Sequence, residues 1–494
     1  MPKKLPIFYS ALLLTGVNLL LRLVGTSFQV YISTRLGPAG VGLLQLVLSV
    51  GSLAMVAGIA GIRTAAMYLT AEELGRKRRG NVVWVLSGCF LYSILCSGTV
   101  GSILYTAAPW IAEHWLGDSR TLDALRLLAA FLPVTCLCAV MTGYFTAANR
   151  IGTLALVEVA EQLFAMLFTM TVLNLWAGTD PGKACLAVVL GSSLGCCITL
   201  LGLVLLRLRE HAPKSKAISV ARRLVDTAVP LGAADVLKSG INTTESLMVP
   251  KRLGLYPLID NPLAAFGLVS GMVFPVIMFP ACILFGLAEL LIPELARCAA
   301  AGSLQRIRYL AQKSLRIALL YGVFFSGGIF LLSEELCLWL YKSTDAAWFL
   351  KLYGLLLPML YCDTITDAMT KGLGQQKACV RYNIFTSTLD VVFLYLLLPQ
   401  YGMMGYFVSF LLTHLLNFLL SLRRLLKITG LALPFHTPTL TLAAAIASVW
   451  GSTGFASPGL RITAYIGLLG SLLYLLKVVS KEDLHWLKGL VIRK

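Results

Sequence analysis

The chain has 494 residues, of which 58% are hydrophobic and only 13% are charged, and its mean hydropathy is +0.82. Soluble globular proteins carry about 25% charged residues, so the composition excludes an ordinary soluble protein and predicts an all-α polytopic membrane protein. The formal net charge of +18 would suit a nucleic-acid-binding protein, but the positions of the cations exclude that class, as shown below.

Fourteen apolar segments can be placed along the chain, each a candidate membrane span. We therefore expect about 14 transmembrane helices. The first span follows Lys3 and Lys4 without a small-residue cleavage site, so we expect it to be uncleaved. The thirteenth is short and rich in alanine. In chain order the segments lie approximately at 7–33, 41–68, 82–107, 124–147, 152–176, 184–206, 222–247, 264–292, 312–333, 348–370, 380–399, 403–422, 438–452 and 460–479.

Lys and Arg residues are concentrated in alternate connecting segments. With the N-terminus inside the cell, 28 of the 41 lie in inside segments and 7 in outside segments. Cytoplasmic loops of membrane proteins carry an excess of Lys and Arg, so we expect an even number of spans with both termini in the cytoplasm. This distribution accounts for most of the net charge without any nucleic acid.

Short motifs recur six spans apart. Arg35-Leu36-Gly37 follows span 1 as Arg252-Leu253-Gly254 follows span 7, and Gly42-Leu43 in span 2 matches Gly267-Leu268 in span 8. Chance matches in so biased a composition are the alternative explanation. A parallel repeat would give two pseudo-symmetric six-helix lobes. The predicted divisions are 1–210 (spans 1–6), 211–430 (spans 7–12) and 431–494 (spans 13–14 and a cytoplasmic tail).

Span 8 combines a long uncharged stretch with helix-breaking residues. No charged side chain occurs in Asn261–Ala288, yet this stretch contains Gly271, Pro275 and Pro280. Proline removes a backbone hydrogen bond and kinks a helix. In lipid, a broken helix is tolerated only where protein or water satisfies the freed backbone groups. We expect Gly271, Pro275 and Pro280 to be bending points of a transporter.

Two arginines lie within predicted spans, where a charge costs roughly 2.5–3.5 kcal/mol on insertion scales. Arg22 is well inside span 1, with no acidic residue near it in that span. Its partner must be another helix, water or an anionic ligand. Arg63 lies toward the inner end of span 2, where it either lines a cavity or extends to the cytoplasmic interface.

Span 7 carries a polar stripe. Asp235 and Lys238 are three residues apart and share a helix face, which Asn242 and Glu245 continue outward. Asp235 and Lys238 could form an internal ion pair, or they could line an aqueous path and separate when substrate binds.

Further acidic residues are candidates for the cavity or for ion coupling. They are Glu161 in span 5, Asp363 and Asp367 in span 10, and Asp390 in span 11. Glu161 lies near a helix N-terminus, where an acidic residue can simply stabilise the helix dipole. Asn417 in span 12 is expected to be an interhelical hydrogen-bond partner.

Enzyme motifs are absent from the sequence. There is no HExxH, Walker loop or GxSxG, so we expect a protein that is not an enzyme, with no catalytic residue. The sequence has no CxxC pair, and most of its twelve cysteines lie in apolar spans as small hydrophobic residues. No metal or cofactor is expected, and transport would be driven by an ion gradient, the membrane potential or the substrate gradient.

Several motifs together resemble one family. They are Arg22-Leu23-x-Gly25 in span 1, Gly61-Ile62-x-Thr64-Ala65 in span 2, Glu161-Gln162 in span 5 and Gly267-x-x-Ser270-Gly271-Met272 with Pro275 and Pro280 in span 8. Over essentially its full length the chain resembles the oligosaccharide flippases related to stage V sporulation protein B. These belong to the multidrug/oligosaccharidyl-lipid/polysaccharide exporter superfamily. Arg63 stands where that family usually has proline.

The resemblance implies two lobes around a central cavity that opens alternately to each side of a bacterial cytoplasmic membrane. Its implied substrates are lipid-linked sugars such as undecaprenyl-pyrophosphate-linked cell-wall precursors. We expect Arg22, Arg63 and Lys238 to form a cationic site for the head group, because arginine binds pyrophosphate with paired donors. Membrane lipids are expected partners, cell-wall or polysaccharide synthesis enzymes are candidate ones, and the protein is expected to be a monomer.

Two other functions stay open at this stage. An ion-coupled multidrug antiporter of the same fold would centre on acidic residues such as Asp235, Asp363, Asp367 and Asp390. A membrane-embedded glycosyl- or phosphotransferase would need a catalytic acidic cluster or a large polar loop, and the sequence has neither.

Overall fold

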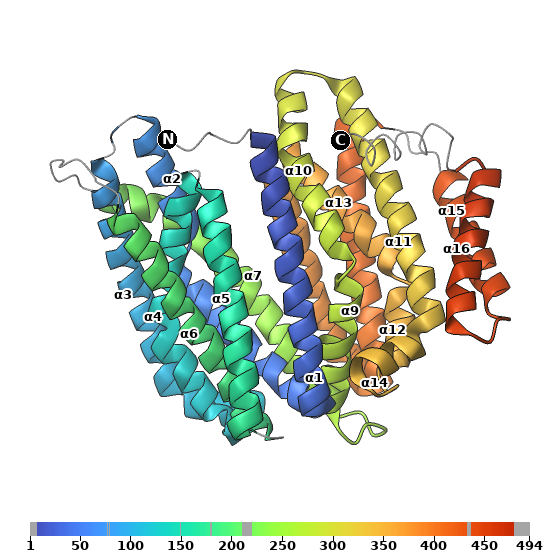
Figure 1. Cartoon of the computed structure of the whole chain (residues 1–494), viewed down its shortest axis with the longest axis horizontal. Helices are drawn as coiled ribbons and strands as arrows, with labels where there is room; N and C mark the ends of the chain where they lie inside the picture. Colours follow the sequence, from blue (N-terminus) through green and yellow to red (C-terminus); the bar gives the residue numbers. More distant parts are fainter. Residues whose placement is uncertain are drawn as a thin grey trace. The chain divides into compact units, whose positions relative to one another are not determined.

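The computed structural model describes residues 7–76, 78, 80–148, 150–177, 180–209, 220–431 and 436–478. Every regular element within these ranges is a helix (Figure 1). The first nine are α1 (Ile7–Ile59), α2 (Ile62–Gly75), α3 (Asn81–Trp110), η1 (Ile111–Leu116), η2 (Ser119–Thr121), α4 (Leu122–Ala147), α5 (Ile151–Val172), η3 (Leu173–Ala177) and α6 (Pro181–Leu208). The others are α7 (Ala221–Leu253), α8 (Pro262–Gly267), η4 (Leu268–Val273), α9 (Phe274–Met278), α10 (Ala281–Ala300), α11 (Leu304–Tyr341), α12 (Ala347–Gly354), α13 (Leu357–Gly372), α14 (Gln376–Thr429), α15 (His436–Ser452) and α16 (Pro458–Leu475).

Within the described residues these helices supply fourteen membrane spans. Eight helices are long and apolar enough to cross a bilayer, and α8 to α10 form a ninth span bent by 60°. The 54 residues of α14 extend about 80 Å, whereas the hydrocarbon core is about 30 Å thick, so α14 holds two spans. The α1–α2 helix likewise holds two. The remaining spans are the polar-striped α7, the interrupted α12–α13 and α15, which has 17 residues. The prediction of an all-α polytopic membrane protein with 14 spans is confirmed.

A single glycine joins the two spans of each long helix. Gly37 in α1 has φ 67° and ψ 175°, and Gly402 in α14 has φ 55° and ψ −134°. A positive φ is accessible to glycine at little steric cost. The sequence predicts separate helices here, with a connecting loop between spans 1 and 2. In the structure one kinked residue redirects the chain at each point, so no loop is needed.

The chain forms two compact units. The first unit comprises Met1–Gly271 and Val391–Met403, and the second comprises Met272–Asp390 and Met404–Lys494. The boundary at 271 falls inside the π-helix η4. These units do not test the predicted lobe boundaries at 210 and 430, which stay predictions, and both chain termini lie outside the described residues.

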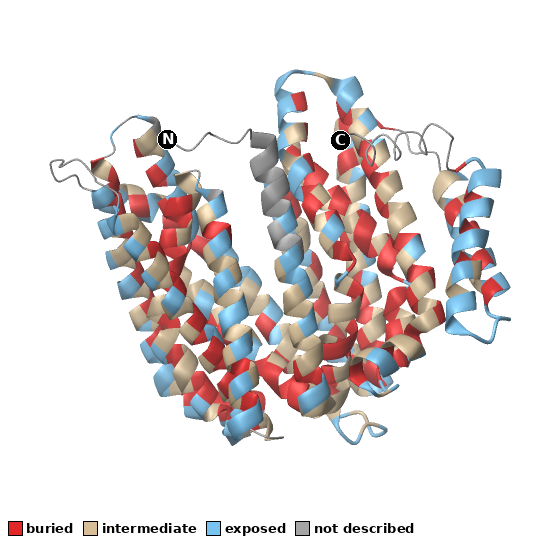
Figure 2. Cartoon of the chain, in the orientation of Figure 1, coloured by how far each residue is buried: buried red, intermediate tan, exposed pale blue. Residues whose placement is uncertain are grey.

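One apolar core of the first unit is built from several spans. Residues from α2, α3, α4, α5, α6 and α7 are buried together in it; they include Ile62, Leu69, Val85, Cys89, Phe145, Leu203, Leu224 and Ala228. Figure 2 shows buried positions on the sides of the helices that face neighbouring helices, with exposed positions on the outer sides. Each helix is therefore held by the apolar stripe that its sequence provides.

The segment 391–403 of the first unit contacts two side chains, one in the last turn of α7 and one just after it. Arg252 donates from Nε and Nη2 to the carbonyl oxygen of Tyr395, at 3.1 and 2.8 Å. Its guanidinium carbon also lies 3.6 Å from the centroid of the Tyr395 ring. The ring of Tyr256 lies 2.7 Å from where a Cβ on Gly402 would be. The end of α7 thus holds the outer part of α14.

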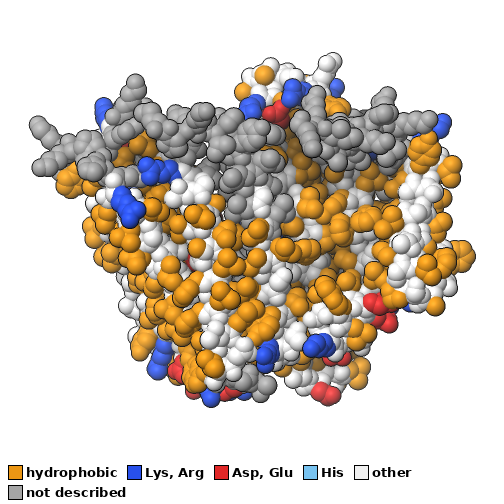
Figure 3. Space-filling view, viewed as in Figure 1, with side chains coloured by type: hydrophobic (Ala, Val, Ile, Leu, Met, Phe, Trp, Pro, Cys, Tyr) orange, Lys and Arg blue, Asp and Glu red, His pale blue; other side chains and the backbone are white. Residues whose placement is uncertain are grey.

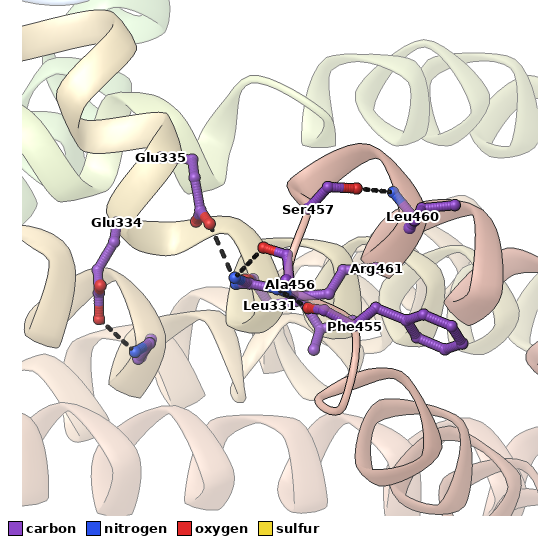
Figure 4. Close-up of polar contacts among 9 residues, drawn as sticks. Leu331, Glu334, Glu335, Phe455, Ala456, Ser457, Leu460 and Arg461 are labelled. Atoms are coloured by element: carbon purple, nitrogen blue, oxygen red, sulfur yellow. Dashed lines mark hydrogen bonds and ion pairs between the residues drawn. The ribbon is translucent and has the colours of Figure 1, made fainter.

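In the second unit, the α15–α16 pair is fastened to α11. The Tyr465 hydroxyl of α16 is buried and donates to the carbonyl oxygen of Val323 at 2.9 Å. Near a kink in α11, Arg461 donates to Glu335 Oε1 at 3.0 Å and to the carbonyl oxygen of Leu331 at 3.4 Å (Figure 4). The same guanidinium bonds the turn before α16, at the carbonyl oxygen of Phe455. One arginine therefore joins the turn to the kinked helix.

The outer helix surfaces are apolar along most of their length. Figure 3 shows hydrophobic side chains over the middle of the visible helices, with Lys, Arg, Asp and Glu mainly toward the helix ends. Leu175 and Trp450, for example, are 83% and 81% exposed. Surfaces of this kind are expected where helices face lipid.

Candidate functional site

The two glycines of the predicted repeat contact each other. A Cβ added to Gly267 would overlap the carbonyl oxygen of Pro38 and lie 2.8 Å from the backbone nitrogen of Gly42. A Cβ added to Gly42 would overlap the carbonyl oxygen of Leu263 and lie 3.3 Å from the backbone nitrogen of Gly267. Pro38 precedes Gly42 by four residues, as Leu263 precedes Gly267. Reciprocal contacts of this kind arise around a two-fold axis, and the repeat stays a prediction.

A second close backbone contact brings the start of α2 against α7. A Cβ on Gly232 would lie 2.5 Å from the carbonyl carbon of Ala60, and a Cβ on Gly61 would lie 2.8 Å from the backbone nitrogen of Gly232. Only glycine permits this approach. Arg63 follows the contact by two residues in α2, and Asp235 follows it by three in α7. The crossing therefore brings two predicted site residues into one region of the first unit.

All three predicted substrate-binding cations lie in the first unit. Arg22 is on α1, Arg63 on α2 and Lys238 on α7, and each is exposed. A charge at membrane depth is costly in contact with lipid. Exposed cations at this depth are therefore expected to face water or a ligand. Arg63 also lies close enough to Glu158 of α5 for electrostatic attraction.

The polar stripe of α7 is open along most of its length. Asp235, Lys238 and Asn242 are exposed, while Glu245 is half-buried. Among the ion pairs of the described residues, none joins Asp235 to Lys238 within 4.0 Å. The sequence left open an internal Asp235–Lys238 ion pair or an aqueous path, and the structure does not have that ion pair. Whether the stripe lines an aqueous path stays a prediction.

Glu161 links two helices of the first unit. Its Oε2 accepts a hydrogen bond from Thr199 Oγ1 at 2.7 Å, and its Oε1 accepts one from Cys196 Sγ at 3.3 Å. Both donors are on α6, whereas Glu161 is on α5. This contact gives Glu161 a structural role, and its part in ion coupling stays a prediction.

Asp363 and Asp367 lie one turn apart on α13 of the second unit. Asn417 Nδ2 on α14 donates to both oxygens of Asp363, each at 3.2 Å. This contact agrees with the expectation that Asn417 bonds another helix. Asp367 Oδ2 pairs with Lys371 Nζ at 2.6 Å. Within the described residues, the buried oxygens Asp367 Oδ1 and Asn417 Oδ1 have no hydrogen-bond partner.

Asp390 is the most deeply buried of the predicted acidic residues, with 5% of its surface exposed. Its Oδ1 accepts hydrogen bonds from Ser409 Oγ at 2.5 Å and Thr413 Oγ1 at 3.2 Å. These contacts join the two halves of α14. The second unit thus holds Asp363, Asp367 and Asp390, and the first unit holds the cations.

Span 8 is interrupted around the three predicted bending points. Gly271 lies in the π-helix η4, Pro275 is the second residue of α9, and Pro280 occupies the turn before α10. Because Pro275 has no N–H, the carbonyl oxygen of Gly271 loses its usual partner four residues on. Ser33 Oγ of α1 donates to that oxygen at 3.1 Å. The 60° bend falls between Met278 and Ala281, at Pro280, and the part of all three residues in bending during transport stays a prediction.

Three tyrosine hydroxyls donate to further carbonyl groups around the bend. They come from α11 and α13 of the second unit: Tyr341 donates to Met272 O at 2.8 Å, Tyr361 to Ile277 O at 3.0 Å, and Tyr321 to Pro280 O at 2.8 Å. Protein side chains thus meet the requirement that a broken helix imposes in lipid.

These tyrosines are absent from the residues predicted from sequence. A tyrosine within an apolar span could have indicated them, because a buried Tyr hydroxyl needs a hydrogen-bond partner. The sequence could flag that need, but it could not identify a backbone carbonyl 41 to 84 residues away as the partner.

Comparison with known proteins defines the family. Residues 8–280, more than half of the chain, match the sequence profile described as polysaccharide biosynthesis protein. The chain belongs to this family. Residues 252–396 also match the MatE profile. Stage V sporulation protein B of Bacillus subtilis (strain 168) is 21% identical over an alignment of 502 positions, which covers 96% of this chain and 96% of that protein. The family predicted from the sequence motifs is confirmed.

Solved structures share the fold of this polysaccharide biosynthesis family member. The lipid II flippase MurJ in an inward closed conformation has a TM-score of 0.71 and 12% identity, covering 93% of this chain and 98% of MurJ. An inward-facing multidrug resistance MATE family transporter of the MOP superfamily has a TM-score of 0.68 and 13% identity, covering 85% of this chain and 100% of that one. At these identities the likeness shows the fold alone.

Proposed function

We propose that this multi-pass membrane protein is a flippase that moves a lipid-linked oligosaccharide or cell-wall precursor across the bacterial cytoplasmic membrane by alternating access. Family membership supports the substrate class, since the relatives include a sporulation protein and the fold is shared with a lipid II flippase. We propose that both termini are cytoplasmic, because the distribution of Lys and Arg among the connecting segments favours that orientation.

The observation that carries the proposal is that three exposed cations lie on membrane spans of one unit. Arg22 on α1, Arg63 on α2 and Lys238 on the polar stripe of α7 are all in the first unit. A pyrophosphate is a dense anion, and a guanidinium can bind it through two parallel N–H donors. These cations would hold the head group in an aqueous cavity while the lipid tail stays in the bilayer, so the sugar need not cross hydrocarbon.

Arg22 tests the role of the cations directly. In proteoliposomes containing an undecaprenyl-pyrophosphate-linked sugar, Arg22→Ala should lower the flipping rate at subsaturating substrate at least tenfold, which corresponds to about 1.4 kcal/mol. Arg22→Lys should recover part of that loss, because it restores charge without paired donors. Arg35→Ala is the matched control, since Arg35 is on α1 like Arg22 but donates to Asn174 Oδ1 of η3 at 2.7 Å. Unchanged flipping by Arg22→Ala would remove Arg22 from the site.

An ion-coupled multidrug antiporter is the second candidate. The half-buried Asp363 and Asp367, the buried Asp390 and the MatE match support it. Its test is dye efflux from vesicles driven by an imposed proton or sodium gradient. Efflux that is lost in Asp363→Asn or Asp367→Asn but kept in Arg22→Ala would favour the antiporter. Flipping that requires Arg22, without any dye efflux, would exclude it.

A further inference from the structure

A cluster of charged side chains fixes the cytoplasmic end of α7. Arg223 Nη2 lies 2.5 Å from Glu72 Oε2, and Arg223 Nη1 lies 3.1 Å from Glu73 Oε1. Glu73 is only 1% exposed, and Asn81 of α3 donates to its other oxygen at 3.0 Å. An arginine held by two adjacent carboxylates, one of them buried, is a stronger link than an exposed surface pair.

The sequence separation of this link distinguishes it from a local pair. Arg223 and Glu73 are 150 residues apart. At the end of span 8, which is the counterpart of span 2 in the repeat, Glu294 instead pairs with Arg306, 12 residues away in the next helix. The carboxylates of α2 thus connect the first six spans to the seventh, whereas Glu294 stabilises only its own helical hairpin.

Two apolar contacts reinforce the link along the inner half of α7. Leu224 and Ala228 follow Arg223 at helical spacing, and they are buried in the core formed by α2, α3 and α4. One turn further on, Gly232 meets Ala60 backbone to backbone. Beyond this point, Thr243 Oγ1 donates to the carbonyl oxygen of Ser49 at 3.1 Å. Successive contacts therefore hold α7 on the first spans along most of its length.

We infer that α7 is a fixed wall of the first unit and that Arg223 is a positioning residue for the site proposed above. The inference rests on the proposed function for its transport consequence. Because α7 carries Lys238 and α2 carries Arg63, the link through Arg223 keeps these two cations in constant register. The head group of an anionic lipid is then held by one rigid body, and the chain flexes beyond α8, in η4.

A substrate-free measurement tests the positioning role. In purified full-length protein, Arg223→Ala should raise amide hydrogen exchange across 220–232 roughly tenfold, which corresponds to about 1.4 kcal/mol of local stability. Arg222→Ala is the matched control. Arg222 is next to Arg223 in the sequence, but its side chain is 96% exposed and its Nε lies 4.0 Å from Asp226 Oδ2. Arg223→Lys should recover part of the protection. Equal exchange in Arg223→Ala and wild type would overturn the inference, whether or not the protein flips a lipid.

A cross-link tests whether α7 stays in place during transport. Glu72→Cys/Arg223→Cys loses the ion pair, and a short thiosulfonate cross-linker cleavable by dithiothreitol replaces it covalently. We expect the cross-linked double variant to flip the precursor at close to the wild-type rate and the reduced variant to be several-fold slower. Each single variant, treated identically, controls for the twelve native cysteines.

The hydrogen-exchange and cross-linking experiments together distinguish failure of the inference from failure of the proposed function. Cross-linked protein that is inactive and regains activity on reduction would show that α7 must leave α2, which overturns the inference. Wild-type protein that flips no lipid-linked sugar contradicts the proposed function instead. In that case the exchange measurement alone decides the position of α7.

Discussion

The contact between Gly42 and Gly267 shows how one atom can determine a helix crossing. Each glycine lies where a Cβ would overlap a carbonyl oxygen of the other segment. The two helices can approach this closely only because both residues lack a side chain, as in small-residue contacts between membrane helices. The sequence identified these two positions as equivalent, but it did not indicate that they touch.

Substitution of either glycine should therefore separate the helices. We expect Gly267→Ala to destabilise the protein by about 1–3 kcal/mol, the range for inserting a methyl group into a well-packed core. Thermal unfolding in detergent measures the change. Gly98→Ala is the control, because a Cβ at Gly98 has no neighbour within 4 Å. A Gly267→Ala variant as stable as Gly98→Ala would contradict the close contact.

At the scale of one element, span 8 is a helix whose bend is held from outside. Pro275 and Pro280 lack the N–H groups that would bond carbonyl oxygens of the preceding turn, and side-chain hydroxyls donate to four carbonyl oxygens around the break. Such satisfaction is obligatory at membrane depth, where water is absent. Tyr361 is the most informative donor, because it is 1% exposed and binds Ile277 O directly before the break.

Tyr361 and Pro280 should be energetically coupled. Removing the hydroxyl in Tyr361→Phe should cost about 1–3 kcal/mol, because a buried carbonyl loses its partner. Pro280→Ala allows the helix to continue, so that Ala281 N–H can bond Ile277 O. The double variant should then be more stable than the sum of the single effects predicts, which a double-mutant cycle of unfolding free energies measures.

Two comparisons complete the test of the bend. Tyr401→Phe is the control, because Tyr401 is 58% exposed. If bending at span 8 limits transport, Pro275→Ala and Pro280→Ala should change the flipping rate more than the substrate affinity. Additive stability effects, or a loss confined to affinity, would contradict a bend that is held by Tyr361 and used in transport.

Hydropathy alone was enough to predict the spans, because lipid requires about 20 apolar residues for each crossing. The same reasoning located the kinks of span 8, since proline lacks a backbone donor. Hydropathy could not predict that Gly37 and Gly402 replace loops, because a positive backbone φ at a single residue does not change the hydropathy of the segment. It also could not predict the Arg223–Glu73 or Asn417–Asp363 contacts, because pairing distant residues requires the folded topology.

On the scale of the whole molecule, all three predicted cations lie in one unit, whereas the six predicted acidic residues are shared between the units, with Glu161, Asp235 and Glu245 in the first. The cations Arg22, Arg63 and Lys238 are in the first unit, and the carboxylates Asp363, Asp367 and Asp390 are in the second. An anionic substrate is attracted to the first set, whereas a coupling cation or proton is attracted to the second. Substrate binding and energy coupling would then reside in different parts of the chain.

This division predicts that binding and coupling can be separated by mutation. Arg22→Ala should raise the substrate concentration needed for half-maximal flipping, with little change in the response to an imposed ion gradient. Asp363→Asn should abolish the gradient response but leave half-saturation within about twofold, because it removes a titratable charge while the amide can still bond Asn417. Flipping rates in proteoliposomes, measured over substrate concentration with and without a sodium or proton gradient, distinguish the two effects. If both variants changed half-saturation and gradient response alike, binding and coupling would share one site.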